Sequence, residues 1–172
     1  YVYIAASGNI YFGGNFNSTR LYISTTDSID HYASTNQNVY FVAYNSAGVF
    51  QSKTQDGNLS EALNLNAFVV TASNDIIATG YTIYSSGSYF YFKKINTAGS
   101  VLWNSGGPYS GRCGGKGNGM CLNAAGTKVY VAGSWTSCFY PYPLTSSSLN
   151  MGVIDIFHLS ANVSNGSSSS TE

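Results

Sequence analysis

Charged side chains are scarce in this 172-residue chain, where Lys, Arg, Asp and Glu together make up 8% of the residues. Typical soluble domains carry roughly 25%. Seven basic and seven acidic residues balance to a net charge of zero, so no basic stripe is available to bind a nucleic-acid backbone. Solubility must therefore come from Ser, Thr and Asn side chains, or from attached glycan.

Long apolar runs and the common catalytic motifs are missing as well. No stretch approaches the roughly 20 apolar residues that a membrane-spanning helix needs, so no membrane span is predicted. Neither a G-x-S-x-G motif nor a P-loop is present, and seven acidic residues leave few candidates for a glycosidase pair. We predict a non-enzymatic protein without catalytic residues, cofactor or metal. No signal peptide is recognised at the start, which favours a processed or excised segment.

Aromatic and β-branched residues fill much of the chain instead. Aromatics make up 15%, with 15 Tyr and 9 Phe, and these residues favour strands. Helical spacing is sustained nowhere, and only residues 59–67 (LSEALNLNA) are candidates for a helical turn. The composition and patterning predict an all-β fold.

One short pattern occurs three times. Residues 128–135 (KVYVAGSW) are matched by residues 9–16 (NIYFGGNF) and 75–82 (DIIATGYT). Each copy follows a polar turn, alternates apolar residues, and ends in a glycine with an aromatic residue within two positions. The repeated glycines are expected where a strand bends or another backbone approaches closely; they are Gly14, Gly80 and Gly133.

The surrounding sequence repeats with the same pattern, at a spacing of about 50 to 65 residues that varies in the loops. Two similar turns, Asn-Ser-Ala-Gly and Asn-Thr-Ala-Gly, follow apolar strands in the first two copies. We predict one domain over residues 1–164, made of three antiparallel four-stranded repeats, with the third lacking its fourth strand. The repeats cover about 1–55, 56–106 and 107–164, and the Ser-rich residues 165–172 (NGSSSSTE) form a linker or tail.

The predicted strands are stated here so that they can be compared with the structure. Residues 15–37 are expected to form a polar loop. The strands are expected at 1–6, 10–14, 38–44, 49–53, 67–72, 75–80, 89–95, 100–104, 119–123, 128–133 and 152–159.

The pattern of turn, x-V-Y-V-x-G strand and later aliphatic-Trp strand resembles the SBBP family of β-propeller repeats. Residues 126–133, 75–80 and 89–103 carry the resemblance. It implies four-stranded β-propeller-like blades set around an axis, on secreted or cell-surface proteins, with no catalytic set. The family's frequent Asp ahead of the third strand is absent, since Asn38, Ser88 and Asn150 stand near that position.

Three blades leave open sheet edges, whereas propellers close with four to eight. The resemblance therefore requires a longer chain or neighbouring chains that complete the structure. A β-trefoil or another closed β-fold is the alternative, because three four-stranded units also close in that way.

Four N-x-S/T sequons mark candidate glycosylation sites. Each is expected at the surface, in a loop, between repeats or in the tail. Glycan there would explain how a chain with so little charge stays soluble; the alternative is an unmodified protein. The candidate residues are Asn17, Asn58, Asn162 and Asn165.

The three cysteines allow one predicted disulfide. A tight turn in the third repeat places Cys121 opposite Tyr130, and the same register places Cys113 opposite Cys138. We predict a Cys113–Cys138 disulfide, provided that the two Cα atoms lie within about 7 Å, and a buried Cys121 thiol. Three reduced cysteines are the alternative, and no C-x-x-C spacing supports a metal site.

Polar and aromatic residues offer two further candidates. Asp27, Asp30 and His31 are close in sequence, as a metal or acid–base cluster would be, but a solvated polar loop is the simpler interpretation. Tyr140 and Tyr142 flank a proline in a loop and are a possible interface for a sugar or a protein. The aromatics after the repeated glycines are expected to pack between repeats; they are Phe16, Tyr81 and Trp135.

Together these observations favour a glycosylated structural repeat module at an extracellular or cell-surface location. It would complete its sheets by self-association or with neighbouring repeats, in a larger surface structure or a filament. The alternative is an adhesion module that binds glycan or protein through loop aromatics.

Overall fold

The computed structural model describes residues 1–31, 36–57, 62–84, 87–104, 114–137 and 153–158. For residues 135–137 and 153–158 the description extends to the backbone alone. These residues contain strands and turns without a helix, and all strand pairs are antiparallel. The predicted all-β class is therefore confirmed. Among the same residues, no helix has the length and hydropathy needed to cross a membrane.

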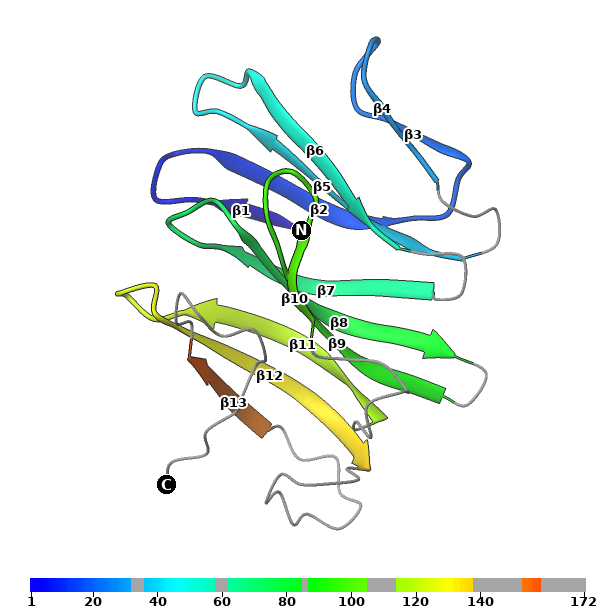
Figure 1. Ribbon diagram of the computed structural model, residues 1–172, viewed down its shortest axis with the longest axis vertical. Coiled ribbons are helices and arrows are strands. Elements are labelled where there is room, and N and C mark those ends of the chain that lie inside the picture. The colour runs from blue at the N-terminus through cyan, green and yellow to red at the C-terminus, as the bar shows by residue number, and fades with distance from the viewer. Residues whose placement is uncertain (32–35, 58–61, 85–86, 105–113, 138–152, 159–172) are drawn as a thin grey trace.

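The first sheet contains four strands that follow one another in the order β1-β2-β5-β6 (Figure 1). Its strands are β1 (Val2–Ile4), β2 (Ile10–Phe16), β5 (Asn38–Tyr44) and β6 (Phe50–Asp56). A small separate hairpin interrupts the run between β2 and β5, formed by β3 (Arg20–Tyr22) and β4 (Ser28–Asp30).

The remaining strands form a larger sheet made of two successive runs. The first run is β7 (Ala62–Val70), β8 (Ile76–Tyr84), β9 (Gly87–Ile95) and β10 (Val101–Asn104). The second is β11 (Gly114–Leu122), β12 (Lys128–Ser137) and β13 (Val153–His158). One backbone pair, Gly114 with Tyr89, joins the two runs.

We call these strands group 1 (β1, β2, β5, β6), group 2 (β7–β10) and group 3 (β11–β13). The groups succeed one another along the long axis of the molecule (Figure 1). Within each group a strand pairs with the next one in the chain, as predicted for consecutive hairpins. None of the described sheets closes on itself as a barrel, and the blade arrangement and the trefoil alternative stay predictions.

Two local predictions were wrong. The described part of the suggested helical turn, residues 62–67, belongs to strand β7, because its apolar side chains alternate and pair with β8. The segment 15–37 is more than a polar loop, since it contains the β3–β4 hairpin. Its apolar residues pack against one another and against residues of β5 and β6 in the first sheet.

Five of the described hairpins share one turn geometry: β1–β2, β5–β6, β7–β8, β9–β10 and β11–β12. The residue that ends each turn has positive φ, between 64° and 83°: Gly8, Gly48, Asn74, Gly99 and Gly126. In the β5–β6 turn the Asn45 side-chain oxygen accepts hydrogen bonds from the amides of Ala47 (3.0 Å) and Val49 (2.9 Å). Asn96 makes the equivalent pair in the β9–β10 turn. These side chains fix the turn locally.

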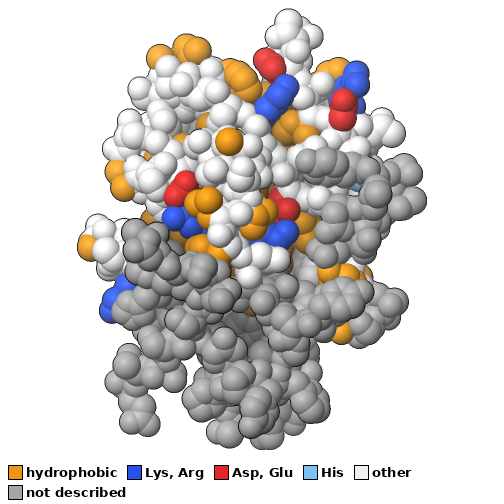
Figure 2. Space-filling model, in the orientation of Figure 1, with side chains coloured by type: hydrophobic (Ala, Val, Ile, Leu, Met, Phe, Trp, Pro, Cys, Tyr) orange, Lys and Arg blue, Asp and Glu red, His pale blue; other side chains and the backbone are white. Residues whose placement is uncertain are grey.

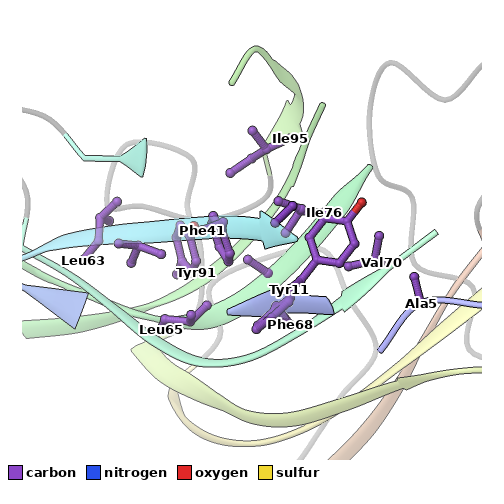
Figure 3. Close-up of a cluster of buried hydrophobic side chains, with 13 residues drawn as sticks. Ala5, Tyr11, Phe41, Leu63, Leu65, Phe68, Val70, Ile76, Tyr91 and Ile95 are labelled. Carbon is purple, nitrogen blue, oxygen red and sulfur yellow. The ribbon is translucent and has the colours of Figure 1, made fainter. Parts of the chain in front are cut away.

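Two hydrophobic clusters hold the groups together. The cluster between groups 1 and 2 includes Tyr11, Phe41, Phe68 and Tyr91 (Figure 3). The cluster between groups 2 and 3 is formed by Val69, Ile77, Phe90, Phe92, Val129 and Val131. Each large side chain fully buried in these clusters contributes about 1.5–3 kcal/mol.

Two of the three repeated glycines lie at close backbone contacts, as predicted, whereas Gly14 faces the side chain of Tyr40. A Cβ added to Gly80 would lie 1.8 Å from the carbonyl oxygen of Asn64, and one added to Gly133 would lie 2.3 Å from that of Lys116. Each of these two glycines faces a β-bulge in the preceding strand. A bulge turns the partner backbone inward, which leaves no space for a side chain.

Candidate interaction faces

Side chains alternate across each group, so every group has two faces. In groups 2 and 3, we call the face towards the preceding group the front face, and in groups 1 and 2 we call the face towards the following group the back face. The front face of group 1 and the back face of group 3 are the faces that carry the equivalent strand positions. The back face of group 1 packs on the front face of group 2. The back face of group 2 packs on the front face of group 3. The described groups therefore stack face to face.

The two interfaces use equivalent positions. Phe68 lies two residues before the last paired residue of β7, and Met120 lies two residues before that of β11. The Phe68 ring packs against Tyr3 (centroids 6.2 Å apart) and Phe41 (5.4 Å). Met120 packs in the cluster that holds Val69 and Phe92, and these occupy the positions of Tyr3 and Phe41 in the next group.

Side-chain amides also connect each group to the next. Asn15 binds both backbone groups of Leu65, accepting from its amide at 2.7 Å and donating to its carbonyl oxygen at 3.3 Å. Asn66 donates to the carbonyl oxygen of Gly117 at 2.8 Å. Leu65 and Gly117 both directly precede a bulge. In both interfaces, therefore, an Asn side chain donates a hydrogen bond to the carbonyl oxygen at the same strand position, in addition to the apolar contact.

A buried charged pair adds to the contact between groups 1 and 2. The Lys93 Nζ atom lies 2.9 Å from the carboxylate of Asp56, and the two side chains are 11% and 10% exposed. The Tyr91 hydroxyl donates to the same carboxylate at 2.8 Å. Because the charges of Lys93 and Asp56 neutralise each other and Tyr91 bonds the same carboxylate, this cluster links the sheets of groups 1 and 2.

The front face of group 1 has the β3–β4 hairpin over one half. Phe16, Ile29 and Val42 are buried there. Leu21, Ile23, Tyr40, Tyr44 and Phe50 pack around them. The hairpin therefore covers the side of the sheet that β5 and β6 form.

The other half of this front face is open. Val2 is 61% exposed, Ile4 69% and Phe12 39%, and Val2 and Phe12 are direct cross-strand neighbours. We call Val2, Ile4 and Phe12 the front strip. Exposed apolar side chains that lie next to one another are typical of protein interaction surfaces.

The back face of group 3 is also exposed in its described part. Cys121 and Ala132 are both exposed there, and we call them the back strip. Cys121 pairs with Tyr130 as predicted, but its predicted burial was wrong. Alternation places Cys121 on the face away from group 2, and no described residue covers that face.

The predicted modification sites divide into described and undescribed residues. Asn17 is exposed directly after β2, where a glycan is sterically tolerated. The other predicted site residues lie outside the described residues: Asn58, Asn162, Asn165, Cys113, Cys138, Tyr140 and Tyr142. The last described pair of the β11–β12 hairpin, Gly114 with Ser137, directly adjoins the two cysteines.

The polar residues of the first long segment do not form one cluster. Asp27 pairs with Lys53 at 3.1 Å, Asp30 pairs with Arg20, and the His31 ring packs edge-on against Phe16. The hydrogen bond between Arg20 and Asp30 raises the pKa of the guanidinium and lowers the pKa of the carboxyl. No three His, Cys, Asp or Glu side chains in the described part of the chain are grouped to hold a metal ion.

The aromatic residues that follow the repeated glycines have different surroundings. Phe16 is buried under the β3–β4 hairpin rather than between groups. The Tyr81 ring lies 4.3 Å from the Nζ atom of Lys116, between groups 2 and 3. Trp135 is described by its backbone alone. Elsewhere, burial raises the pKa of Tyr11, whose hydroxyl donates to Asn74 at 3.2 Å.

Charged side chains are sparse on the visible surface, where acidic and basic groups lie next to one another (Figure 2). Hydrophobic and neutral polar side chains occupy the area between them. The described part of this face therefore offers little electrostatic steering to a charged ligand.

No protein-family model matches the chain, and no curated protein matches it either. The resemblance to the SBBP repeats accordingly stays a prediction from the sequence.

Proposed function

We propose that this chain is a non-enzymatic, glycosylated extracellular structural module, in which blade-like sheets stack face to face. It packs with neighbouring chains or with further sheets of the same kind, in a larger surface structure or filament. The adhesion alternative, through Tyr140 and Tyr142, has its support in the sequence alone.

One observation carries the proposal: two interfaces are built from equivalent positions, and the equivalent front face of group 1 exposes Val2, Ile4 and Phe12. Because these side chains are partly exposed, each forgoes a part of the roughly 1.5–3 kcal/mol that full burial would contribute. A further sheet on this face would recover much of it. The low charge of the chain supports association too, because little repulsion opposes the contact.

Measurement of molar mass over a wide range of protein concentration tests the proposal. We expect mass to rise with concentration, and Phe12→Ser to lower the association. Val101→Ser is the matched control, because Val101 is an exposed apolar residue (49%) on β10 and outside the front strip. A chain that remains monomeric at every concentration would contradict the proposal.

A further inference from the structure

We infer that the front strip of one copy of this chain seats on the back strip of group 3 in a second copy. In this contact Val2 of one chain lies against Cys121 and Ala132 of the next. The inference rests on the proposed function, and it names both faces and the partner.

The equivalence of positions leads to this pairing. Val2, Phe68 and Met120 each lie two residues before the last paired residue of the first strand in their group. Phe68 lies on Tyr3 and over Gly13, where an added Cβ would come within 2.8 Å of the Phe68 ring. In group 3 the positions of Tyr3 and Gly13 are occupied by Cys121 and Ala132.

The burial at the two internal interfaces supports the same conclusion. Within the chain, the positions equivalent to Cys121 and Ala132 in group 2 are Val69 and Thr79. These are 2% and 0% exposed, because group 3 covers them. Cys121, Ala132 and Val2 itself are exposed. The two exposed strips are thus the two halves of an interface that the chain already forms twice.

Side-chain size is compatible with the contact. Gly13 offers an open position to the Phe68 ring, and Cys121 and Ala132 are small residues that leave space for an aliphatic side chain. Val2 is smaller than Phe68, and the methyl group of Ala132 fills part of the space that Gly13 leaves to the larger ring. Both strips are uncharged, so no ion has to be desolvated.

The β3–β4 hairpin does not obstruct this arrangement. It covers Tyr40 and Val42 on group 1. The equivalent positions on group 2 are Tyr91 and Lys93, which Asp56 of the fourth strand of group 1 contacts. The described part of group 3 consists of three strands. The hairpin of the copy that carries the front strip would lie beside the described strands of group 3, at the position that a fourth strand takes in the internal interface.

The contact joins two different faces, so it is heterologous. Repetition of such a contact closes a ring if the rotation between copies permits, and otherwise produces an open string of molecules. The native Cys121 thiol lies inside the contact and provides a direct probe of the geometry.

Cysteine cross-linking of the full chain tests the inference. Val2→Cys should give a ladder of covalent oligomers under mild oxidation, with peptide mapping that joins position 2 to Cys121. The ladder should disappear when Val2→Cys is combined with Cys121→Ser. Tyr22→Cys, an equally exposed cysteine on the hairpin, should give no link to Cys121.

A second variant tests the same contact without covalent chemistry. Ala132→Arg should weaken association by about tenfold or more, because a charge would be buried in an apolar contact. Thr127→Arg, at an exposed turn of the same hairpin, should leave association unchanged. Circular dichroism and thermal unfolding establish that each variant is folded.

The outcomes separate this inference from the proposed function. If the chain associates but position 2 links to itself, to another cysteine or no better than position 22, the pairing of strips is wrong and the structural role stands. If the chain does not associate at all, both fail.

Discussion

A single backbone requirement recurs at the end of several hairpin turns. Among the described residues, five of the six positions with positive φ are glycines and the sixth is Asn74, at φ 64°. Glycine reaches this region without a Cβ penalty, and asparagine is the side chain that tolerates it best. The sequence pattern N-x-A-G therefore encodes both the Asn side-chain bonds and the residue that ends the turn.

Substitutions at Gly48 test this requirement in isolation, because no heavy atom lies within 4 Å of a Cβ placed there. Gly48→Ala should lower the free energy of unfolding by about 1 kcal/mol, from backbone strain alone. Gly48→Asn should cost clearly less. Urea denaturation measures both; equal losses would show that strain is not the cause.

The buried pair of Lys93 and Asp56 predicts a larger effect. Lys93→Met leaves the Asp56 carboxylate buried without its cation, and should cost about 3–5 kcal/mol. Lys94→Met is the control, because Lys94 pairs with Asp75 at 2.9 Å in a more exposed site and should cost much less. A combined Asp56→Asn and Lys93→Met variant should regain part of the loss in the same denaturation assay; no recovery would count against the pairing.

At the scale of elements, the β3–β4 hairpin is an addition to group 1 rather than a member of its sheet. It contacts the sheet through a small cluster around Ile29, which is 5% exposed. Such a satellite can open without disrupting the larger clusters between groups.

Ile29→Ala should therefore loosen the hairpin with a cost of about 2 kcal/mol, at the low end for such substitutions. Ile77→Ala, in the cluster between groups 2 and 3, should cost about 4 kcal/mol. Hydrogen exchange should show faster exchange confined to residues 20–30 in the Ile29 variant. Faster exchange throughout group 2 would contradict the hairpin's independence.

The open end of the β11–β12 hairpin carries the predicted Cys113–Cys138 disulfide. The pair Gly114 and Ser137 ends the described register beside both cysteines. Intact mass before and after reduction should show one disulfide and one free thiol at Cys121. Removal of the disulfide should cost about 3 kcal/mol, as expected for a loop of this length. Three thiols available to alkylation in the unreduced protein would rule it out.

The order of strands was predictable because each hairpin is determined by residues near one another in sequence. The alternation in residues 38–44 and the turn at Asn45 indicate the β5–β6 hairpin without reference to the rest of the chain. The β3–β4 hairpin was not predictable, because Ile29 is held by Phe16 and Val42, which belong to strands β2 and β5 outside the hairpin.

The candidate site was predictable only in part for a related reason. Alternation along β11 shows that the side chains of Cys121 and Met120 lie on opposite faces of the sheet. It does not show which of the two faces another sheet covers. The exposure of Val2 and Phe12 likewise depends on where the β3–β4 hairpin ends over group 1. Burial is a property of the stacked groups, and no local pattern encodes it.

At the scale of the whole molecule, solubility is the outstanding requirement, since a chain with 8% charged residues also exposes an apolar strip. Glycan at Asn17 would supply hydration close to the front face of group 1, on which Phe16 packs beneath the hairpin. A chain of zero net charge has little charge repulsion to keep its molecules apart in solution, so a glycan would be an important source of solubility.

Secretion from a eukaryotic host tests this glycan. Asn17→Gln should reduce the mass by one glycan and lower solubility, with an unchanged circular dichroism spectrum. Asn118→Gln is the matched control, because Asn118 is also exposed but lies in no sequon, so mass should not change. An identical mass for Asn17→Gln and the parent protein would exclude modification at this residue.

The shared turn geometry has a consequence for the way the chain acquires its structure. In the described part of the chain, the strands β1–β2, β5–β6, β7–β8, β9–β10 and β11–β12 are each joined by a short turn, so these pairings involve nearby residues. Local pairing of this kind is rapid. A chain leaving the ribosome can therefore complete group 1 while group 3 has yet to be synthesised, and each finished sheet then offers the next one a surface on which to fold.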